Sequence, residues 1–417
     1  MRFITFIFAI ILSITLLSAQ YRTKIMASNI RTLITGGQYQ DFSLPVIDLQ
    51  SDQNIEIRFD EMSHESHLFA YTIIHCNADW TPSDLSNTEY LSGYTTAYIR
   101  DSERSVNTHH LYTHYRFSVP NDEMGLKVSG NYVVLIYADN RRDKPIAQVC
   151  FSAVEPRVRA SAKVRANTDT EIGGRFQQLD FDINLSGYIV RDPMSEIRVV
   201  IRQNNRSDNE ITQIRPSFLQ GSTLKYQNNK ALIFEGGNEY RSFDISSVHV
   251  SGRGVDRIRF ANNQYEALLL PDRIARGAYE HAFDVNGRFK INAQEAFTDR
   301  HTESDYMLVH FNLPVPQVFF DGQLFVGGEF NFNLMNDFNR MQFNNQTESY
   351  QKSVLLKQGG YNYQYWFLPK NGSKATVERT EGSYWQTGNE YQIYVYHRAW
   401  GERYDRLIGF FQTESNK

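Results

Sequence analysis

The chain has 417 residues, of which 41% are apolar, so it is long enough to bury the cores of roughly two to three domains. Its formal net charge of −4 and its pI near 6.3 argue against a nucleic-acid-binding protein, because neutralising phosphates requires a basic surface. The same charge balance does not favour binding to an acidic membrane surface.

Residues 1–19 have the layout of a cleavable export signal. Arg2 supplies a positive charge, residues 3–17 form an apolar stretch, and Ser18 and Ala19 end it with small side chains. The stretch is shorter than the ~20 apolar residues that a membrane-spanning helix needs. No cysteine stands at the expected cleavage point to carry a lipid anchor. We therefore expect a signal peptide at 1–19 and an exported mature chain that does not insert into the membrane.

Apolar and polar residues alternate with a period of two along the rest of the chain. The alternation is clear at 55–59, 179–183 and 393–396, and it is typical of strands that bury one face. Helical signals at 82–89 and 334–338 are too short for more than connecting turns. The sequence predicts an all-β protein.

Proline residues mark two expected domain boundaries. Pro156 follows the last strand of the first segment, and Pro314-Val-Pro316 interrupts a later run of strands. We expect three tandem immunoglobulin-like β-sandwich domains, over residues 20–155, 156–315 and 316–417.

The two cysteines, Cys76 and Cys150, both lie on predicted strands of the first domain. Outside the reducing cytosol a disulfide between them would persist. Both also stand in apolar runs, where a free cysteine packs as a small hydrophobic residue. We favour two buried thiols, and the disulfide stays the alternative.

Several histidines gather in the first domain. A zinc site is one interpretation of this group, but the spacings lack the helical His-Glu-x-x-His frame that aims two imidazoles at one metal. We expect hydrogen-bonded histidines and no metal. The histidines concerned are His64, His67, His75, His109, His110 and His114.

Motifs of catalysis are missing from the sequence. There is no Gly-x-Ser-x-Gly turn and no phosphate-binding Gly-rich loop, and Gly252-Arg-Gly254 lacks the third glycine of a dinucleotide turn. Asp180 and Asp182 share one strand face, but they alternate with apolar residues and are expected to be solvated rather than a hydrolase pair. We predict a protein that is not an enzyme and has no cofactor.

A run of basic residues opens the second domain. Arg157, Arg159, Lys163 and Arg165 alternate along one predicted strand. Such charges protect an exposed strand at a sheet edge from pairing with other chains. The alternative is a patch that docks a partner protein.

The first domain carries the strongest local signature. It combines His75-Cys76 with Trp80, the stretch 89–94, a Thr-Tyr strand at 112–115 and Ser129-Gly-Asn-Tyr132. In these residues the chain resembles the type IX secretion plug proteins of the Bacteroidota. The resemblance continues in order through 203–204, 236–241, 284–287, 305–306 and 356–363, whereas Cys150 replaces an expected basic residue and 372–388 matches nothing firmly.

The resemblance implies a non-catalytic plug in the periplasm, at the inner face of the outer membrane. Its partner would be the large outer-membrane β-barrel translocon, whose periplasmic opening it would seal when no cargo is present. The expected partner contacts are Trp80, Tyr90, Tyr94, Arg157 and Arg159. For the large aromatic residues Trp80 and Tyr90 the alternative is packing in the domain core.

The third domain supports an alternative function. The stretches 324–330 and 356–366 resemble early-set immunoglobulin-like modules that bind starch and glycogen. Such modules stack sugar rings on tryptophans, and Trp366, Trp385 and Trp400 are the candidates here. The alternative is therefore an exported glycan-binding protein.

Overall fold

The computed structural model describes residues 20–37, 42–138, 141–275 and 277–415. The export signal expected at 1–19 lies outside the described residues. Nearly all of the regular secondary structure in the described chain is β-strand, which confirms the all-β prediction. No helix in these ranges is both long and apolar enough to cross a bilayer. The helical elements are α1 (Asn87–Tyr90), α2 (Pro193–Glu196), α3 (Arg300–Glu303) and the 3₁₀ turns η1 (Lys230–Leu232) and η2 (Glu329–Asn331).

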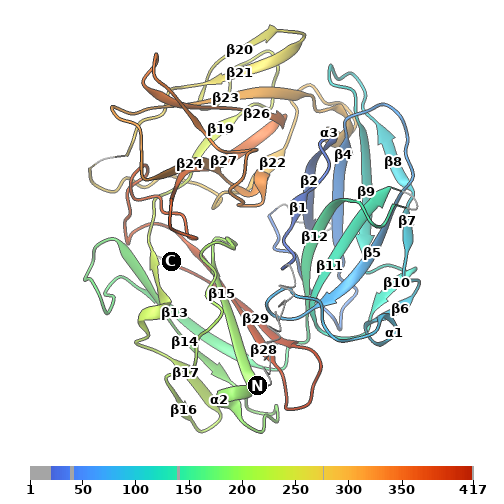
Figure 1. Cartoon of the computed structure of the whole chain (residues 1–417), viewed down its shortest axis with the longest axis vertical. Helices are drawn as coiled ribbons and strands as arrows, with labels where there is room; N and C mark the ends of the chain where they lie inside the picture. Colours follow the sequence, from blue (N-terminus) through green and yellow to red (C-terminus); the bar gives the residue numbers. More distant parts are fainter. Residues whose placement is uncertain (1–19, 38–41, 139–140, 276, 416–417) are drawn as a thin grey trace, which may run out of the picture.

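The first unit is a sandwich of two sheets and a small ribbon, on the right of Figure 1. The first sheet has the order β1-β12-β11-β5-β7, with β3 also paired to β12, and the second has the order β2-β4-β9-β8. The alternating Ile55, Ile57 and Phe59 of β4 point into the core, as their pattern predicts. The strands are β1 (Lys24–Ile25), β2 (Ile30–Gly37), β3 (Val46–Asp48), β4 (Ile55–Glu61), β5 (Phe69–Cys76), β6 (Leu91–Gly93), β7 (Ala97–Ile99), β8 (Asp101–Arg104), β9 (Thr113–Val119), β10 (Met124–Leu126), β11 (Gly130–Ala138) and β12 (Pro145–Val154).

The second unit combines strands from the middle of the chain with its C-terminal hairpin. One sheet has the order β13-β14-β17-β16, with β18 on β14, and the other has the order β15-β28-β29. Both sheets contribute to one hydrophobic core. The strands are β13 (Arg159–Arg165), β14 (Phe176–Asn184), β15 (Ile197–Gln203), β16 (Phe218–Gln220), β17 (Thr223–Tyr226), β18 (Ile233–Glu235), β28 (Glu390–His397) and β29 (Arg406–Glu414).

The third unit is built from the residues that lie in sequence between β18 and β28 of the second unit. One of its sheets has the order β20-β21-β23-β26-β25, and the other places β19, β22 and β24 against β27. The strands are β19 (Arg241–Asp244), β20 (Val255–Ala261), β21 (Gln264–Leu269), β22 (Phe289–Ile291), β23 (Tyr306–Pro314), β24 (Gly322–Gly327), β25 (Gln342–Asn344), β26 (Ser349–Lys357) and β27 (Gly359–Pro369).

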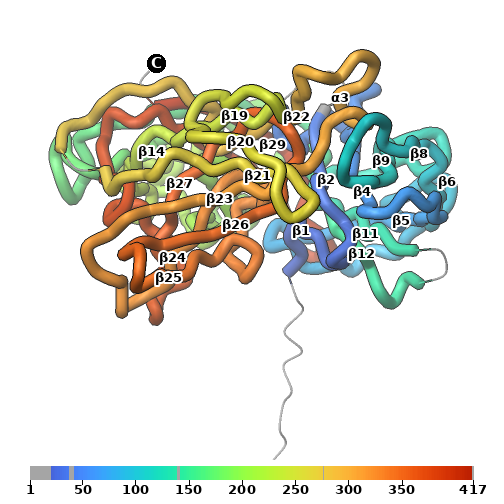
Figure 2. Tube along the Cα trace, turned by 90° about the horizontal axis from the view of Figure 1, so that it is seen from above, coloured from blue at the N-terminus to red at the C-terminus, as the bar shows by residue number. Residues whose placement is uncertain are grey.

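The sheets divide the chain differently from the boundary expected near residue 315. The strand β23 ends at Pro314 and pairs along its whole length with β26, so residues on both sides of 315 share one sheet. The C-terminal strand β28 pairs with β15 of the second unit. The prolines therefore mark a connection within the third unit, which is inserted into the second. Figure 2 shows the first unit beside the other two when the molecule is seen from above.

Both cysteines are free and buried. In the first sheet β11 lies between β5 and β12, and it pairs with Cys76 at Asn131 and with Cys150 at Val133. Two strands on opposite sides of a third are about 9.5 Å apart, which is beyond the reach of a disulfide. Burial raises the pKa of both thiols, that of Cys150 to about 12.

We predict that neither thiol reacts with a soluble thiol reagent in the folded protein. Thiolates are the reactive form, and buried thiols of raised pKa supply almost none at neutral pH. Two equivalents should react in denaturant without any reductant, as measured by absorbance of the released chromophore. A reaction that requires prior reduction would contradict the register of these strands.

Candidate functional site

Two of the five expected partner contacts are buried, Tyr90 in the core of the first sandwich and Trp80 in a small cluster on the other face of its first sheet. Trp80 is 5% exposed and packs with Cys76, Val133 and Cys150. Tyr90 is 3% exposed, and its hydroxyl lies 2.6 Å from Asn87 Oδ1. Both side chains are enclosed by the fold, so the partner-contact interpretation is replaced for them by core packing.

The other three expected contacts are on the surface. Tyr94 is 67% exposed, and Arg157 and Arg159 are exposed where the chain enters the second unit. The strand β13 pairs with β14 alone, so it is a sheet edge, as the basic pattern indicates. The guanidinium of Arg157 also pairs with Glu155. These three side chains are accessible to a partner.

The remaining candidates of the sequence have local partners. Asp180 accepts a hydrogen bond from Arg165 at 2.7 Å, and Asp182 accepts one from Lys225 at 2.5 Å. His67 lies 2.9 Å from the Glu61 carboxylate. In the described part of the chain no group of three or more His, Cys, Asp or Glu side chains could hold a metal ion.

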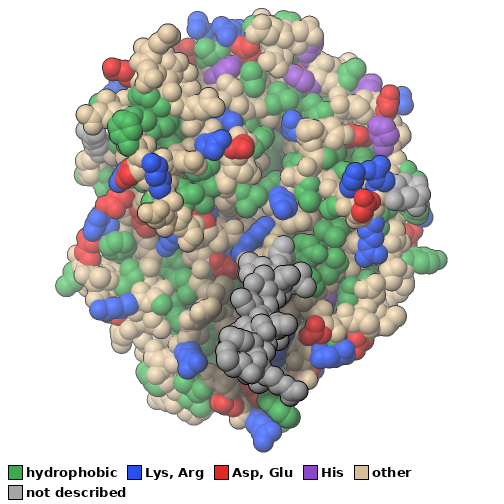
Figure 3. Space-filling view, in the orientation of Figure 1, with side chains coloured by type: hydrophobic (Ala, Val, Ile, Leu, Met, Phe, Trp, Pro, Cys, Tyr) green, Lys and Arg blue, Asp and Glu red, His purple; other side chains and the backbone are tan. Residues whose placement is uncertain are grey.

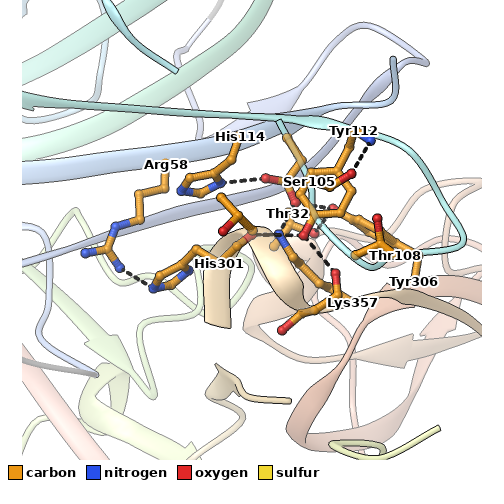
Figure 4. A network of polar contacts seen from close by, with 12 residues as sticks. Thr32, Arg58, Ser105, Thr108, Tyr112, His114, His301, Tyr306 and Lys357 are labelled. Carbon is orange, nitrogen blue, oxygen red and sulfur yellow. Dashed lines mark hydrogen bonds and ion pairs between the residues drawn. The ribbon is translucent and has the colours of Figure 1, made fainter. Parts of the chain in front are cut away.

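A buried polar cluster, which we call the first clamp, joins the first unit to the third (Figure 4). It consists of Asp60, His114, His301, Tyr306 and Lys357. Asp60, near the end of β4, accepts hydrogen bonds on Oδ2 from Lys357 at 2.5 Å and from Tyr306 at 2.6 Å. His114 of β9 approaches Oδ1 at 2.6 Å. Tyr306 and Lys357 are paired across β23 and β26, so one sheet presents both groups to Asp60.

The charges of the first clamp are removed from water. The side chains of Asp60 and Lys357 are each 1% exposed. Lys357 also donates to the carbonyl of His301 at 2.5 Å, and its ammonium lies 4.1 Å from the centre of the Tyr112 ring. Separating two such charges leaves each one buried without a partner, which costs several kcal/mol. The pair therefore holds the two units in one relative position.

The pKa values of Asp60 and His301 show how the first clamp controls charge. Although burial acts to raise it, the pKa of Asp60 is held below its ordinary value by Lys357 and His114. Burial, together with the Arg58 guanidinium, lowers the pKa of His301 to about 3. His301 accepts a hydrogen bond from Arg58 at 3.0 Å and stacks on the His114 ring. The imidazole of His301 is therefore neutral at pH 7.

A second cluster, the second clamp, joins the first unit to the C-terminal hairpin. It consists of Asn77, Asn131, Tyr396, Arg398 and Asp405. The Asp405 carboxylate accepts a hydrogen bond from the backbone N–H of Ala78 at 2.9 Å, and it forms an ion pair with Arg398 at 3.0 Å. Tyr396 donates to Asn131 at 2.9 Å, and Asn131 donates to the carbonyl of Asn77 at 3.0 Å. The loop that follows Cys76 in the sequence signature is thus the surface on which the second unit docks.

The second and third units are also joined by buried contacts. Arg288 pairs with both carboxylate oxygens of Glu390, at 2.7 and 2.6 Å. The ring of Trp366 is fully buried, and the Arg206 guanidinium lies 4.3 Å from its centre. Trp366 cannot stack on a sugar in this position, which removes one tryptophan from the proposed glycan site. Trp385 lies beside Gly174 of the second unit, and Trp400 is exposed between β28 and β29.

The sequence interpretation missed the two clamps. Asp60 alternates with Ile57 and Phe59 as an outward-facing residue, and a single chain gives no signal that another unit covers that face. Because Asp60 and Lys357 are inaccessible, the first clamp offers no route to a substrate. Its chemistry is that of a structural junction.

Residues 30–155 match the family described as the type 9 secretion system plug protein 1st domain. A crystal structure of a hypothetical protein from Parabacteroides merdae ATCC 43184 is similar to this chain over 95% of its length and over 100% of that protein. The sequence identity is 38% and the TM-score is 0.93. No curated protein matches the chain.

Proposed function

This chain belongs to the type 9 secretion system plug protein family, and from that membership we propose that it closes the translocon of this system. It binds the periplasmic opening of the outer-membrane β-barrel and occupies it while no cargo passes. Its action is passive, and no side chain transforms a substrate. It works in the periplasm, to which the expected signal peptide directs it.

The observation that carries the proposal is the match of the first unit to the plug domain. The two clamps support it, because a body that blocks an opening must resist deformation. The Asp60–Lys357 ion pair fixes the first unit to the third, and the hydrogen bond from the Ala78 backbone to Asp405 fixes it to the second. Rigid partners also lose little conformational entropy when they bind.

We propose Tyr94, Arg157 and Arg159 as contacts to the barrel. They are the accessible members of the set that the sequence singles out. Tyrosine and arginine are also the side chains that most often dominate binding energy at protein interfaces. Exposed charges at the rim mainly set the association rate and the choice of partner.

Affinity capture tests the proposal directly. The tagged protein is expected to retain a large outer-membrane barrel from detergent-solubilised envelopes of its native host. Replacing all three contacts (Tyr94→Ala, Arg157→Glu and Arg159→Glu) should weaken binding at least ~10-fold, which corresponds to about 1.4 kcal/mol. The matched control is Arg257→Glu on β20, which changes an exposed arginine of the third unit and should leave capture unchanged.

A strain that lacks the protein provides a second test, whose result can contradict the proposed function. If its envelope excludes a small hydrophilic dye as well as the parent does, the proposed sealing role is wrong. If the barrel is captured equally by the triple variant and the wild type, the role stands and the contact residues are wrong.

A further inference from the structure

The three units meet around a cavity that none of the contacts above uses. It has a volume of about 160 Å³ and is lined by residues from all three units. Arg22 and Trp80 come from the first unit, Arg202 from the second, and Glu329 and Asn333 from the third. Figure 3 shows the face that is hollowed between the first unit and the other two, with basic side chains in the hollow. An engineered cavity of about 150 Å³ in another protein holds benzene, so a small ligand fits.

One part of the wall is cationic. Arg202 pairs with Glu210 at 2.5 Å, and Arg22 lies 3.7 Å from the same carboxylate. One carboxylate therefore faces two guanidinium groups. Buried Nη1 of Arg22 has no hydrogen-bond partner among the described residues. A ligand carboxylate would supply the missing acceptor and balance the second positive charge.

Another part of the wall offers acceptors. Glu329 and Asn333 belong to the turn around η2, where Asn333 adopts a left-handed conformation with φ of 54°. Asn333 is 4% exposed, and its buried Oδ1 has no hydrogen-bond partner in the described chain. Burial raises the pKa of Glu329, although the Arg288 guanidinium and a hydrogen bond from Asn205 act to lower it. An ammonium group would supply the donor that Asn333 Oδ1 lacks and would stabilise the charged form of the Glu329 carboxylate.

The lining also includes aromatic side chains, among them Trp80, Phe332 and Tyr394. A methylene chain suits such a lining because it loses no hydrogen bonds to water when it is buried.

We infer that this cavity binds a small linear zwitterion, with its carboxylate at Arg22 and Arg202 and its ammonium at Glu329 and Asn333. The inference goes beyond the proposed plug function and does not rest on it. The site lies where the units meet, so its occupant contacts all three of them.

A series of ω-amino acids from glycine to 6-aminohexanoate tests the site by calorimetry on the full chain. Affinity should peak at one chain length, which reports the separation of the two ends of the site. At that length the matched half-probes, the alkylamine and the alkanoate, should bind at least ~10-fold more weakly, since each loses one charge-assisted contact. Fluorescence of Trp80 in the wall should change with the same dissociation constant.

Two variants separate the ends of the site. Glu329→Gln should remove the advantage of the zwitterion over the alkanoate, and Arg22→Gln should remove its advantage over the alkylamine. The control is Glu103→Gln, an exposed residue of β8, which should bind as the wild type does. Absence of binding by every member of the series at millimolar concentration, with the wild type folded, would mean that water alone fills the cavity and would overturn the proposal.

Discussion

Replacing Asp60 with asparagine is expected to lower the free energy of unfolding by about 3 to 5 kcal/mol. The substitution keeps the shape of the side chain but leaves the buried Lys357 ammonium without a counter-charge. It also weakens the contacts with His114 and Tyr306. Denaturant titration followed by tryptophan fluorescence measures the change.

A double variant decides whether the ion pair is the cause. Adding Lys357→Met to Asp60→Asn removes the stranded charge, so the double variant should recover part of the lost stability. Arg116→Gln, which removes an exposed ion pair on β9, is the matched control and should cost at most about 1 kcal/mol. If the double variant is less stable than Asp60→Asn alone, packing around Lys357 outweighs its charge.

Acidification from pH 8 to pH 5 is expected to destabilise the fold by about 3 kcal/mol. Burial lowers the pKa of His75 to about 4, and burial with Arg58 lowers that of His301 to about 3. Both histidines titrate near 6.5 when unfolded, so between these values the unfolded chain binds more protons than the folded one. Stability therefore falls as the pH falls, by about 2 kcal/mol per histidine at pH 5. Burial raises the pKa of Asp284 to about 6, which opposes the loss by roughly 1 kcal/mol.

Single variants assign the pH dependence to its groups. His75→Gln and His301→Gln should each flatten the slope of unfolding free energy against pH between 6.5 and 5. The exposed His281→Gln is the control and should leave the slope unchanged. A wild-type stability that is constant from pH 8 to pH 5 would show that neither buried imidazole resists protonation.

The sequence predicts the fold class because apolar residues alternate with polar ones along several strands, as burial on one face requires. Ile55, Ile57 and Phe59 display that alternation and all lie in the first core. The sequence of a strand carries no comparable signal that indicates which other strand it pairs with. Nothing in residues 390–397 indicates that they pair with β15, almost two hundred positions earlier. For that reason the expected domain boundary near residue 315 does not agree with the way the strands are grouped into sheets.

Some of the candidate functional residues can be predicted from the sequence, and others are revealed only by the structure. The edge position of the basic strand follows from its alternating charges. Asp60 and Lys357 are polar positions on strands, and only the docking of one unit on another turns them into a buried pair. The aromatic residues Trp80 and Tyr90 of the sequence signature are both buried, but only Tyr90 lies in the core of the first sandwich.

The split second unit determines when the molecule can become complete. Its core contains β14 and β15 together with Tyr391, Ile393 and Ile408, which lie near the very end of the chain. A polypeptide that is synthesised from its N-terminus can finish the first sandwich early, whereas the second core forms only when the last strands are available. The hairpin of β28 and β29 also carries Asp405, so its folding joins the second unit to the first. A chain that lacks these last strands therefore has neither a complete second core nor the Asp405 contact that joins the second unit to the first.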